Sequence, residues 1–489
     1  MARDSPRLRF APSPTGTLHL GNARTALINW LVARASGGAL VLRIEDTDTA
    51  RNVEGAEQHI FEILRWLGID WDEGPDVGGD RGPYRQSERG ALYREAVARL
   101  LEAELVYYCF EDPGELRAAQ AEARQHGRSL QHACRDLSPS EARRRVEAGE
   151  QAAVRFRVPD RPVRFEDGLR GSTGVQAGEV DDFVVARRDG TPTYQLAVVV
   201  DDHGMSIDHV VRGQDHLSNT PKQLLLYEAL GWSPPRFTHL PLVLGADRSR
   251  LSKRHGDVTV EQMRADGVLP EALANYLTLL GWAPPDGREV WRLMELVESF
   301  EISGLSPSNV GFDVTKLEWL NQQHLLALPL DEVLERARGR LADAGIELAA
   351  DGPARDWWRE LVDLVRPSLR RIDELPQQLY KLTRAPAVTE STESAAHLHD
   401  MLRAFHQASR ADELSTAADF KTAARRVAKE TGMSGRALFQ PLRMALTGED
   451  HGPELARLVP LIETARRSGV EPDIETVAER IAPLVAAHG

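Results

Sequence analysis

The segment from Ala11 to Asn22, Ala-Pro-Ser-Pro-Thr-Gly-Thr-Leu-His-Leu-Gly-Asn, joins a strand pattern to a helix pattern through a rigid loop. Pro12 and Pro14 exclude both a helix and pairing inside a sheet, and Gly16 supplies a tight bend. From Asn22 onward apolar residues recur at helical spacing, so the free N–H groups at the start of the helix face whatever occupies the loop. The segment therefore predicts a cradle for the phosphates of a nucleotide.

The first ninety or so residues alternate between strand and helix patterns, which predicts a parallel sheet of the Rossmann type. The expected elements are strands at 7–11 and 40–44 and helices at 22–35 and 54–67. Between about residues 91 and 189 an Arg/Glu-rich helix pair precedes short strands such as 154–158, and we interpret this part as an insertion. The sheet is expected to resume with a buried strand at 194–200, a strand at 208–211, a helix at 221–230 and a strand at 239–244.

Beyond residue 256 the patterns are almost wholly helical. The expected helices are 270–280, 331–344, 355–365, 416–429 and 453–465. Breaks at Leu328-Pro329 and at 384–394 indicate hinges between subdomains. These patterns divide the chain into segments 1–90, 91–193, 194–246, 247–329, 330–388 and 389–489.

A second loop, from Asp247 to Gly256, carries Lys253 between Arg250 and Arg254. A cationic loop can neutralise a leaving pyrophosphate while the chemistry proceeds. Taken alone, His19 is more often a helix cap and a basic loop is more often solvated surface. The two together are a more specific signal for a nucleotide site.

His19-Leu-Gly-Asn22 resembles the "HIGH" signature of class I aminoacyl-tRNA synthetases, and Leu251-Ser-Lys-Arg254 resembles their "KMSKS" signature. Asn22 stands where the first signature has its second histidine, so His19 must supply the imidazole contact alone. Further segments resemble the bacterial-type glutamyl-tRNA synthetases: Arg43 to Asp48, Pro83 to Arg89, Gly190 to Tyr194, Val199 to His203 and Val211 to Gln223. The resemblance covers nearly the whole chain and weakens between about residues 109 and 180.

The resemblance implies a Rossmann-type catalytic domain split by an α+β insertion and followed by an all-α, anticodon-binding C-terminal half. Segments 1–90 and 194–246 would form the catalytic domain, and 91–193 would hold the acceptor end of the RNA. Segment 247–329 would contact the RNA stem and carry the lysine loop. Segments 330–388 and 389–489 would be two anticodon-binding subdomains, with Phe439 to Gly448 in the second.

The reaction implied is ATP-dependent ligation of L-glutamate to tRNA(Glu) through glutamyl-adenylate, with release of AMP and pyrophosphate. Glutamate activation in this family is expected to need tRNA. The enzyme mainly positions reactants and stabilises charge, so we expect no covalent nucleophile, and no Ser/His/Asp triad motif is recognisable. Whether tRNA(Gln) is charged as well stays open.

The resemblance assigns residues to each role. The catalytic residues would be His19 and Lys253. The ATP-binding residues would be Pro12, Ser13, Thr17, His19, Gly21, Asn22, Val243, Ser252, Lys253 and Arg254. The glutamate-binding residues would be Arg9, Ala11, Ser13, Glu45, Tyr194 and Arg212.

Choosing glutamate requires a cation, because a buried carboxylate without a partner is strongly disfavoured. Arg9 and Arg212 are the candidates, and a neutral amide offers them no charge partner, so glutamine should be rejected. Glu45 would anchor the ammonium group. The alternative is that Arg9 and Arg212 form simple structural ion pairs at strand ends.

Metal sites are not expected in this chain. Asp201, Asp202 and His203 could suggest one, as could Glu45, Asp46 and Asp48, but we favour hydrogen bonds that hold the floor of the site. Mg²⁺ should arrive with ATP, coordinated mostly by phosphates and water. Some relatives bind zinc through Cys-x-Cys and Cys-x-His pairs. Here Cys109-Phe-Glu111 and Cys134-Arg-Asp136 stand instead, so we expect no zinc even with His126 and His132 nearby.

Composition fits this interpretation. A chain of 489 residues with 42% hydrophobic residues can form several domains, each with a core. The two cysteines argue against a disulfide framework, and the sequence shows no apolar leader and no stretch of membrane-spanning length. We therefore expect a soluble, cytoplasmic enzyme that acts as a monomer without a membrane partner. The net charge of −14 does not exclude RNA binding, because basic segments at 143–170 and 421–443 create local potential.

Four other kinds of protein share part of this sequence pattern. Another enzyme of the same superfamily is the nearest, but the glutaminyl branch ends in β-barrels and the C-terminal pattern here is helical. A shortened paralogue that glutamylates a tRNA base would lack the anticodon half. A small-molecule nucleotidylyltransferase would not need that half, and a noncatalytic tRNA-binding relative would lose His19 or Lys253.

Overall fold

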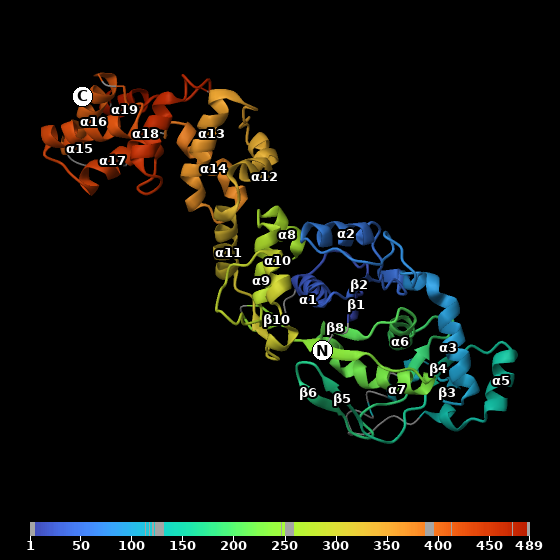
Figure 1. Ribbon diagram of the computed structural model, residues 1–489. Coiled ribbons are helices and arrows are strands. Elements are labelled where there is room, and N and C mark those ends of the chain that lie inside the picture. Colours follow the sequence, from blue (N-terminus) through green and yellow to red (C-terminus); the bar gives the residue numbers. More distant parts are fainter. Residues whose placement is uncertain are drawn as a thin grey trace. The chain divides into compact units, whose positions relative to one another are not determined.

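The computed structural model describes residues 5–112, 114–116, 118–119, 122, 132–245, 247–249, 259–386, 396–411, 413–471 and 473–486. They form two compact units (Figure 1). The first unit comprises residues 1–263 and 273–313, and the second comprises 264–272 and 314–489. None of the described helices is long and apolar enough to cross a membrane.

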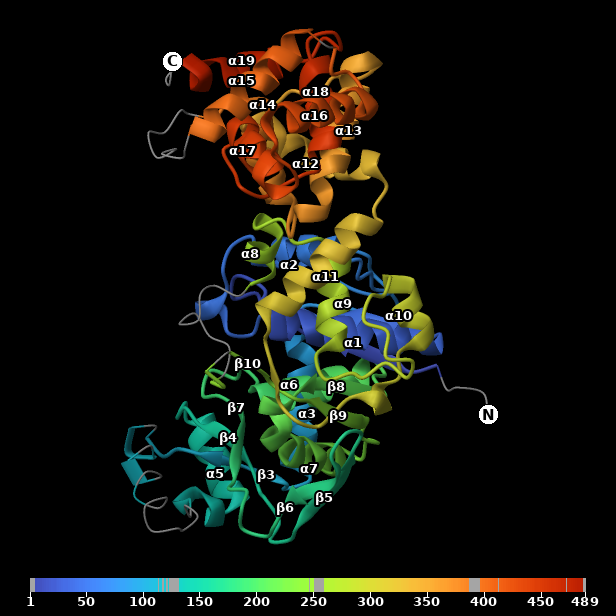
Figure 2. The same cartoon turned by 90° about the vertical axis from the view of Figure 1, so that its left-hand side faces the viewer.

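The centre of the first unit is built from parallel strand pairs, as the alternating pattern predicted. β1 (Arg7–Phe10) pairs with β2 (Ala39–Leu42), and β8 (His209–Gly213) pairs with β9 (Arg236–Leu240). The backbone N–H of Asp208 donates to the Arg7 carbonyl at 3.1 Å and links the two pairs. Helix α1 (Leu20–Ser36) packs against β1, β2 and β8 (Figures 1 and 2). The Rossmann-type expectation is therefore confirmed.

The ends of the predicted helices follow from their capping residues. α1 ends at Gly37, whose φ of 66° allows its N–H to bond the carbonyls of Ala33 and Arg34. α7 (Thr220–Leu230) ends in the same way at Gly231, with φ 72°. The predicted helix at 54–67 is α2 (Ala56–Trp66).

The expected buried strand at 194–200 is wrong, because this segment is helix α6 (Tyr194–Gly204). Every residue from Leu196 to Asp202 is buried. A helix that is buried on all sides carries the same unbroken apolar run as a covered strand, so periodicity alone could not separate the two. As a result, Asp201 and Asp202 lie in the last turns of a buried helix and do not follow a strand.

The described residues of the inserted segment form two α-helices and two small groups of strands. α3 (Gly90–Glu102) and α5 (Pro139–Glu147) are the expected Arg/Glu-rich helices, but β3 (Val106–Cys109) lies between them in the chain. β3, β4 (Ala153–Phe156) and β7 (Phe183–Ala186) form an antiparallel sheet. β5 (Val163–Asp167) and β6 (Gly171–Val175) form a hairpin, and Asp167 pairs in parallel with Phe237 of β9. The insertion is therefore joined to the central strands through β5.

The expected strand at 239–244 is divided at Pro241, which lacks a backbone donor. β9 stops at Leu240, and β10 (Val243–Leu244) pairs with β11 (Val310–Gly311) instead. The helices that follow are α8 (Val260–Ala265), α9 (Pro270–Leu279) and α10 (Leu293–Ser299).

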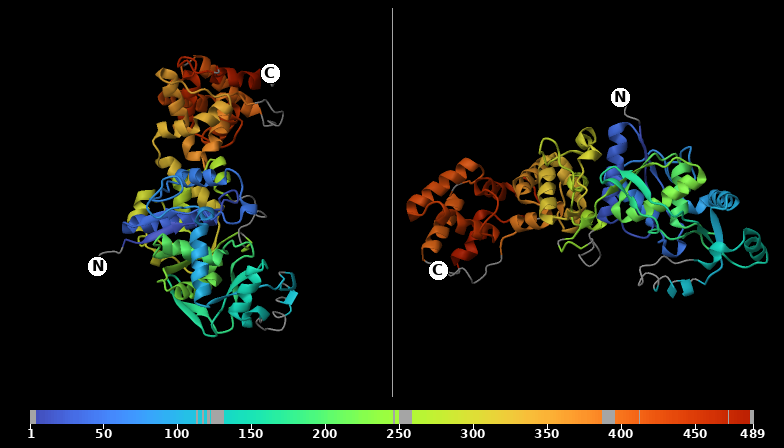
Figure 3. Two further views of the ribbon diagram at one scale, coloured as in Figure 1. Left: turned by 90° about the vertical axis from the view of Figure 1, so that its right-hand side faces the viewer. Right: turned by 90° about the horizontal axis from the view of Figure 1, so that it is seen from below.

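The described residues of the second unit from 314 onward form helices and loops without strands (Figure 3). The α-helices are α11 (Val314–Ala327), α12 (Leu330–Asp343), α13 (Gly352–Val365), α14 (Leu375–Thr383), α15 (Ala396–Ala411), α16 (Ala417–Thr431), α17 (Arg436–Thr447), α18 (Leu455–Thr464) and α19 (Val477–Ala486). Thr416 and Asp419 form a capping box at the start of α16. The Leu328-Pro329 break separates α11 from α12, while most of the 384–394 break lies outside the described residues. The expected all-α C-terminal half is confirmed.

Candidate active site

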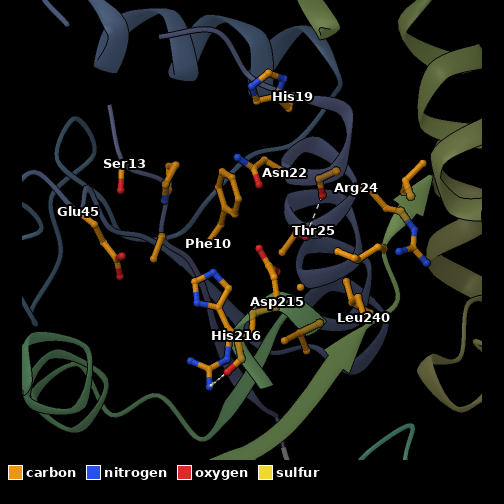
Figure 4. Close-up of a pocket in the computed structure, with 18 of the residues that line it drawn as sticks. Phe10, Ser13, His19, Asn22, Arg24, Thr25, Glu45, Asp215, His216 and Leu240 are labelled. Carbon is orange, nitrogen blue, oxygen red and sulfur yellow. Dashed lines mark hydrogen bonds between the residues drawn. The ribbon is translucent and has the colours of Figure 1, made fainter. Parts of the chain in front are cut away.

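A cavity of about 430 Å³ opens at the carboxyl ends of β1, β8 and β9, where ligands bind in sheets of this type (Figure 4). Ser13 and Glu45 lie on one side of it, Asn22 and Thr25 lie across from them, and His19 lies at the start of α1. The predicted site residues that line it are Arg9, Ala11, Pro12, Ser13, His19, Gly21, Asn22, Glu45, Tyr194, Arg212 and Val243. Thr17 is exposed and is not among the lining residues. Ser252, Lys253 and Arg254 lie outside the described residues.

The proline loop is fixed by its own backbone. Gly16 has φ 124°, a conformation that favours glycine, so it provides the bend that the sequence predicted. The Pro12 carbonyl accepts from the Glu45 N–H at 3.0 Å, and the Pro14 carbonyl accepts from the Val53 N–H at 2.9 Å. The loop is thus tied on both sides to the segment that follows β2.

His19 occupies the N-cap position of α1, yet its imidazole forms no capping hydrogen bond. Its carbonyl accepts from the N–H groups of Asn22 and Ala23, each at 3.0 Å, while its side chain is exposed. The alternative that His19 serves only as a helix cap is therefore not supported. A Cβ on Gly21 would meet no protein atom within 4 Å, so packing within the protein does not require glycine there.

The residues that follow the lysine loop contact Leu18 and His19 at the start of α1. Thr259 forms an antiparallel bridge with His19. Glu261 accepts from the Leu18 N–H at 2.8 Å, and its same oxygen lies 2.7 Å from Nε2 of His59. The sequence interpretation did not include Glu261. Its signal in the sequence is an acidic residue in the first turn of the helix that follows the basic loop.

Arg212 is a buried arginine that lines the cavity, as are Arg9 and Arg24, and 5% of its surface is exposed. Its guanidinium donates to Thr220 Oγ1 at 2.7 Å and to His239 Nε2 at 3.1 Å. Among the described residues no carboxylate oxygen lies within ion-pair distance of it. Burial lowers the pKa of Arg212. A buried cation without a protein counter-ion favours an anionic ligand.

Arg9 lies beside an internal network of charges. Its Nε donates to Asp202 Oδ1 at 3.3 Å, and Arg43 donates to the same oxygen at 2.7 Å. Burial by itself raises the pKa of Asp202, but the charges of Arg9 and Arg43 outweigh it and hold that pKa below its usual value. Arg43 also donates to Glu45 at 3.3 Å, yet burial still raises the pKa of Glu45. The ion-pair alternative for Arg9 is thus partly correct.

Asp201 and His203 also have internal roles. Asp201 accepts from Arg89 at 2.5 Å, from Gln86 at 2.8 Å and from the Tyr93 hydroxyl at 3.0 Å. His203 stacks on Trp232, with ring centroids 3.9 Å apart. The hydrogen bonds of Asp201 and Asp202 support the hydrogen-bonded floor that the sequence favoured, whereas the contact of His203 is a ring stack.

In the inserted segment Cys109, Glu111 and His132 come together, with ligand atoms within 4.8 Å of one another. Asp136, the expected second carboxylate, is not part of this group. Burial raises the pKa of Cys109 to about 11, and the Arg155 Nε donates to its sulfur at 3.3 Å. The group offers one thiol beside a carboxylate and an imidazole, whereas structural zinc sites use four ligands that are mostly thiolate and imidazole.

Tyr194 reaches the cavity from the start of α6. Its hydroxyl lies 3.0 Å from Nδ1 of His216, and Arg212 Nη1 approaches it at 3.5 Å. Burial lowers the pKa of His216 to about 4, so its ring is neutral near pH 7. The sequence interpretation missed His216, Thr220 and His239, because nothing in their spacing marks them as neighbours of Arg212.

The comparisons with known proteins agree with this geometry. The family model described as "tRNA synthetases class I (E and Q), catalytic domain" matches residues 6–319, and an "Anticodon binding domain" model matches residues 330–466. The glutamate–tRNA ligase of Bacillus licheniformis is 42% identical over 93% of this chain and 96% of its own length. That of Desulforudis audaxviator is 43% identical over 94% of each chain.

A solved structure gives the same result. The glutamate tRNA ligase of Elizabethkingia meningosepticum, in complex with its amino acid, superposes with a TM-score of 0.87 at 30% identity. The match covers 99% of both chains. Both the catalytic and the helical parts therefore have counterparts in that enzyme.

Proposed function

The chain belongs to the class I tRNA synthetase family of the glutamate and glutamine enzymes, and we propose which of its residues carry each step of the reaction. It catalyses the ATP-dependent ligation of L-glutamate to tRNA(Glu). The α-carboxylate of glutamate attacks the α-phosphorus of ATP, so a new O–P bond forms as pyrophosphate leaves. The terminal ribose hydroxyl of the tRNA then attacks the carbonyl of glutamyl-adenylate and AMP leaves.

The glutamate end of the cavity consists of Arg9, Glu45, Tyr194 and Arg212. The single observation that carries the assignment is the buried guanidinium of Arg212 without a carboxylate partner among the described residues. It binds the side-chain carboxylate of glutamate, with the Tyr194 hydroxyl and Ser13 as neutral donors. Glu45 holds the ammonium group. Arg9, already partly neutralised by Asp202, adds positive potential, and the Ala11 backbone contacts the substrate.

The ATP end consists of Ser13, His19, Gly21 and Asn22 at the start of α1. His19 donates to phosphate oxygens, and the N–H groups of the helix start face them. Gly21 leaves room for the nucleotide against the backbone. Pro12, Thr17 and Val243 complete the ATP contacts.

Lys253 is the second catalytic residue, flanked by Ser252 and Arg254. Val243, before the loop, lines the cavity, and Thr259, after it, bridges to His19. Lys253 precedes Thr259 by six residues, and a chain of that length spans at most about 20 Å. This placement supports a role for Lys253 at the leaving pyrophosphate.

Mg²⁺ enters with ATP. Asp46 accepts from the Ser87 hydroxyl at 2.6 Å, and Glu45 is paired with Arg43, so these carboxylates are already engaged. The ion neutralises phosphate charge and is coordinated mostly by phosphates and water. We propose no resident zinc, because the Cys109 group offers one thiol, one carboxylate and one imidazole, fewer soft donors than a closed structural zinc site uses.

The division of the chain follows from these roles. Segments 1–90 and 194–246 form the catalytic domain, 91–193 holds the acceptor end, and 247–329 contacts the stem. Segments 330–388 and 389–489 read the anticodon. The enzyme acts as a cytoplasmic monomer, which gel filtration with light scattering and fractionation of the source cells would test.

ATP–pyrophosphate exchange with the purified protein tests the function. Exchange should require glutamate and tRNA(Glu) together, and omission of either should abolish it. Exchange that is independent of tRNA, or that glutamine supports as well as glutamate does, would contradict the assignment. Charging of tRNA(Glu) and tRNA(Gln) side by side decides whether the second is also a substrate.

A further inference from the structure

A buried chain of polar side chains runs from the inserted segment to Arg212. Asp167 ends β5, His239 lies in β9 and Arg212 lies in β8, and these three residues are at most 5% exposed. Asp167 Oδ2 lies 2.6 Å from His239 Nδ1, and His239 Nε2 lies 3.1 Å from Arg212 Nε. These hydrogen bonds thus link β5, β9 and β8 through the imidazole ring of His239.

The partners of His239 determine its protonation. A guanidinium can only donate, so Nε2 of His239 must carry a lone pair to accept from Arg212. Nδ1 then carries the proton and donates to the Asp167 carboxylate. Burial lowers the pKa of His239 despite the nearby carboxylate, in keeping with a neutral ring. A proton on Nε2 would face the guanidinium directly and break the contact.

Asp167 is itself rigidly held. Its Oδ1 accepts from the N–H groups of Leu169 at 3.0 Å and Arg170 at 3.1 Å, and its Oδ2 also accepts from the His239 N–H at 3.1 Å. Burial alone would raise the pKa of Asp167, but these donors and the imidazole lower it below its usual value. A fixed carboxylate therefore holds the orientation of the His239 ring.

The same contacts set the rotation of the guanidinium. Thr220 Oγ1 lies 2.7 Å from Arg212 Nη2 and 3.1 Å from His239 Nε2, which closes a triangle around one edge of Arg212. The opposite edge carries Nη1, which approaches the hydroxyl of the cavity-lining Tyr194 at 3.5 Å. One edge of the arginine is occupied by the protein, and the other is presented to the ligand.

We propose that Asp167 and His239 are positioning residues for amino-acid specificity: they fix the tautomer and guanidinium orientation with which Arg212 selects glutamate over glutamine. The inference rests on the proposed role of Arg212. It extends the specificity determinants from the cavity wall to β5 of the inserted segment.

The test measures kcat and KM for glutamate and for glutamine in tRNA-dependent pyrophosphate exchange. Asp167→Asn can donate to Nδ1 and thereby favour the wrong tautomer, so it should reduce the glutamate preference about tenfold. The loss should appear as a higher KM for glutamate, with kcat at saturating glutamate little changed. His239→Leu should do the same, whereas His239→Gln retains an acceptor and should restore most of the preference.

His209→Gln is the matched control. His209 is another buried histidine, in β8, and its ring contacts Thr238 Oγ1 at 2.9 Å rather than Arg212. This variant can reduce stability but should leave the glutamate preference unchanged. A merely structural role of Asp167 and His239 would make their variants behave like this control.

Variants in an Arg212→Ala background separate the two possible failures. If Arg212→Ala itself leaves the preference unchanged, the proposed role of Arg212 is wrong. If Arg212→Ala abolishes the preference but Asp167→Asn and His239→Leu retain it, the positioning inference is wrong. If Arg212→Ala and the Asp167 and His239 variants all lower the glutamate preference, then Asp167→Asn combined with Arg212→Ala should cause no further loss of preference. Should Asp167→Asn fail to fold, the contrast between His239→Leu and His239→Gln decides.

Discussion

The two ends of the cavity differ in how far contacts within the protein fix the orientation of their side chains. At the glutamate end, Arg212 is buried and held by His239 and Thr220, and Arg9 is bonded to Asp202. At the ATP end, Ser13, His19 and Asn22 are exposed, and the His19 side chain forms no capping hydrogen bond. One end is preorganised, and the other is completed by its ligand.

This difference matches the chemistry of each substrate. Selecting a carboxylate against an amide requires fixed, desolvated charge, because an unpaired buried cation penalises the neutral competitor. Stabilising a phosphoryl transition state requires donors that gain strength as charge develops. We therefore expect substitutions at the glutamate end to change affinity and specificity, and substitutions at the ATP end to change rate.

The largest effect is expected at the ATP end. Lys253→Ala should slow adenylate formation on the order of a hundredfold, because its contact with the leaving pyrophosphate is made mainly in the transition state. Single-turnover formation of glutamyl-adenylate in the presence of tRNA measures this rate. Equal losses in glutamate affinity and in rate would remove the distinction between the two ends.

The next effect belongs to the glutamate end. Arg212→Ala should weaken glutamate binding by about 2 kcal/mol, roughly thirtyfold, because the substrate carboxylate loses its charge partner. The preference over glutamine should fall with it. Arg212→Lys keeps the charge without the planar fork and should lie between wild type and alanine. An unchanged ratio of glutamate to glutamine kcat/KM in the alanine variant would make Arg212 a structural residue.

A smaller effect is expected for His19→Ala. Loss of one hydrogen bond to a charged phosphate should lower the rate of adenylate formation about tenfold. The KM for glutamate should stay constant, since His19 lies at the other end of the cavity. A change in the glutamate KM of the same size as the change in rate would argue that the ends are coupled.

A separate effect, on stability rather than on catalysis, is expected at low pH in the strand that carries Arg212. Burial lowers the pKa of His209 from 6.5 to about 4, so below pH 6.5 the unfolded chain binds a proton that the folded chain does not. Stability is therefore lost as pH falls from 6.5 towards 4, by about 2 kcal/mol at pH 5. His209→Gln should remove this part of the loss. Urea unfolding of both proteins at pH 7.5 and pH 5 measures it, and equal pH dependence would contradict the assignment to His209.

The sequence predicted those features whose signals are local. The proline loop was predicted from its own residues, and the helix expected at 22–35 is α1, which runs from Leu20 to Ser36 and so differs by two residues at its start and one at its end. The buried helix α6 was mistaken for a strand because its apolar run has no periodicity. The division of the 239–244 strand depends on the pairing of β10 with β11, which is tertiary information.

The candidate site shows the same limit. Arg9, Glu45, Tyr194 and Arg212 could be named because short motifs surround them, and the structure brings all four to one cavity. Asp167 and His239 could not be named as neighbours of Arg212. Their proximity arises only where β5, β8 and β9 meet.

The central claim is that glutamate recognition and phosphate chemistry reside at separate ends of one cavity. The most direct test measures the glutamate KM, the glutamine kcat/KM and the single-turnover adenylation rate in Arg212→Ala and Lys253→Ala side by side. The predicted result is crossed: Arg212→Ala changes KM and preference, whereas Lys253→Ala changes the rate and leaves both intact. Proportional changes of all three quantities in both variants would contradict the account.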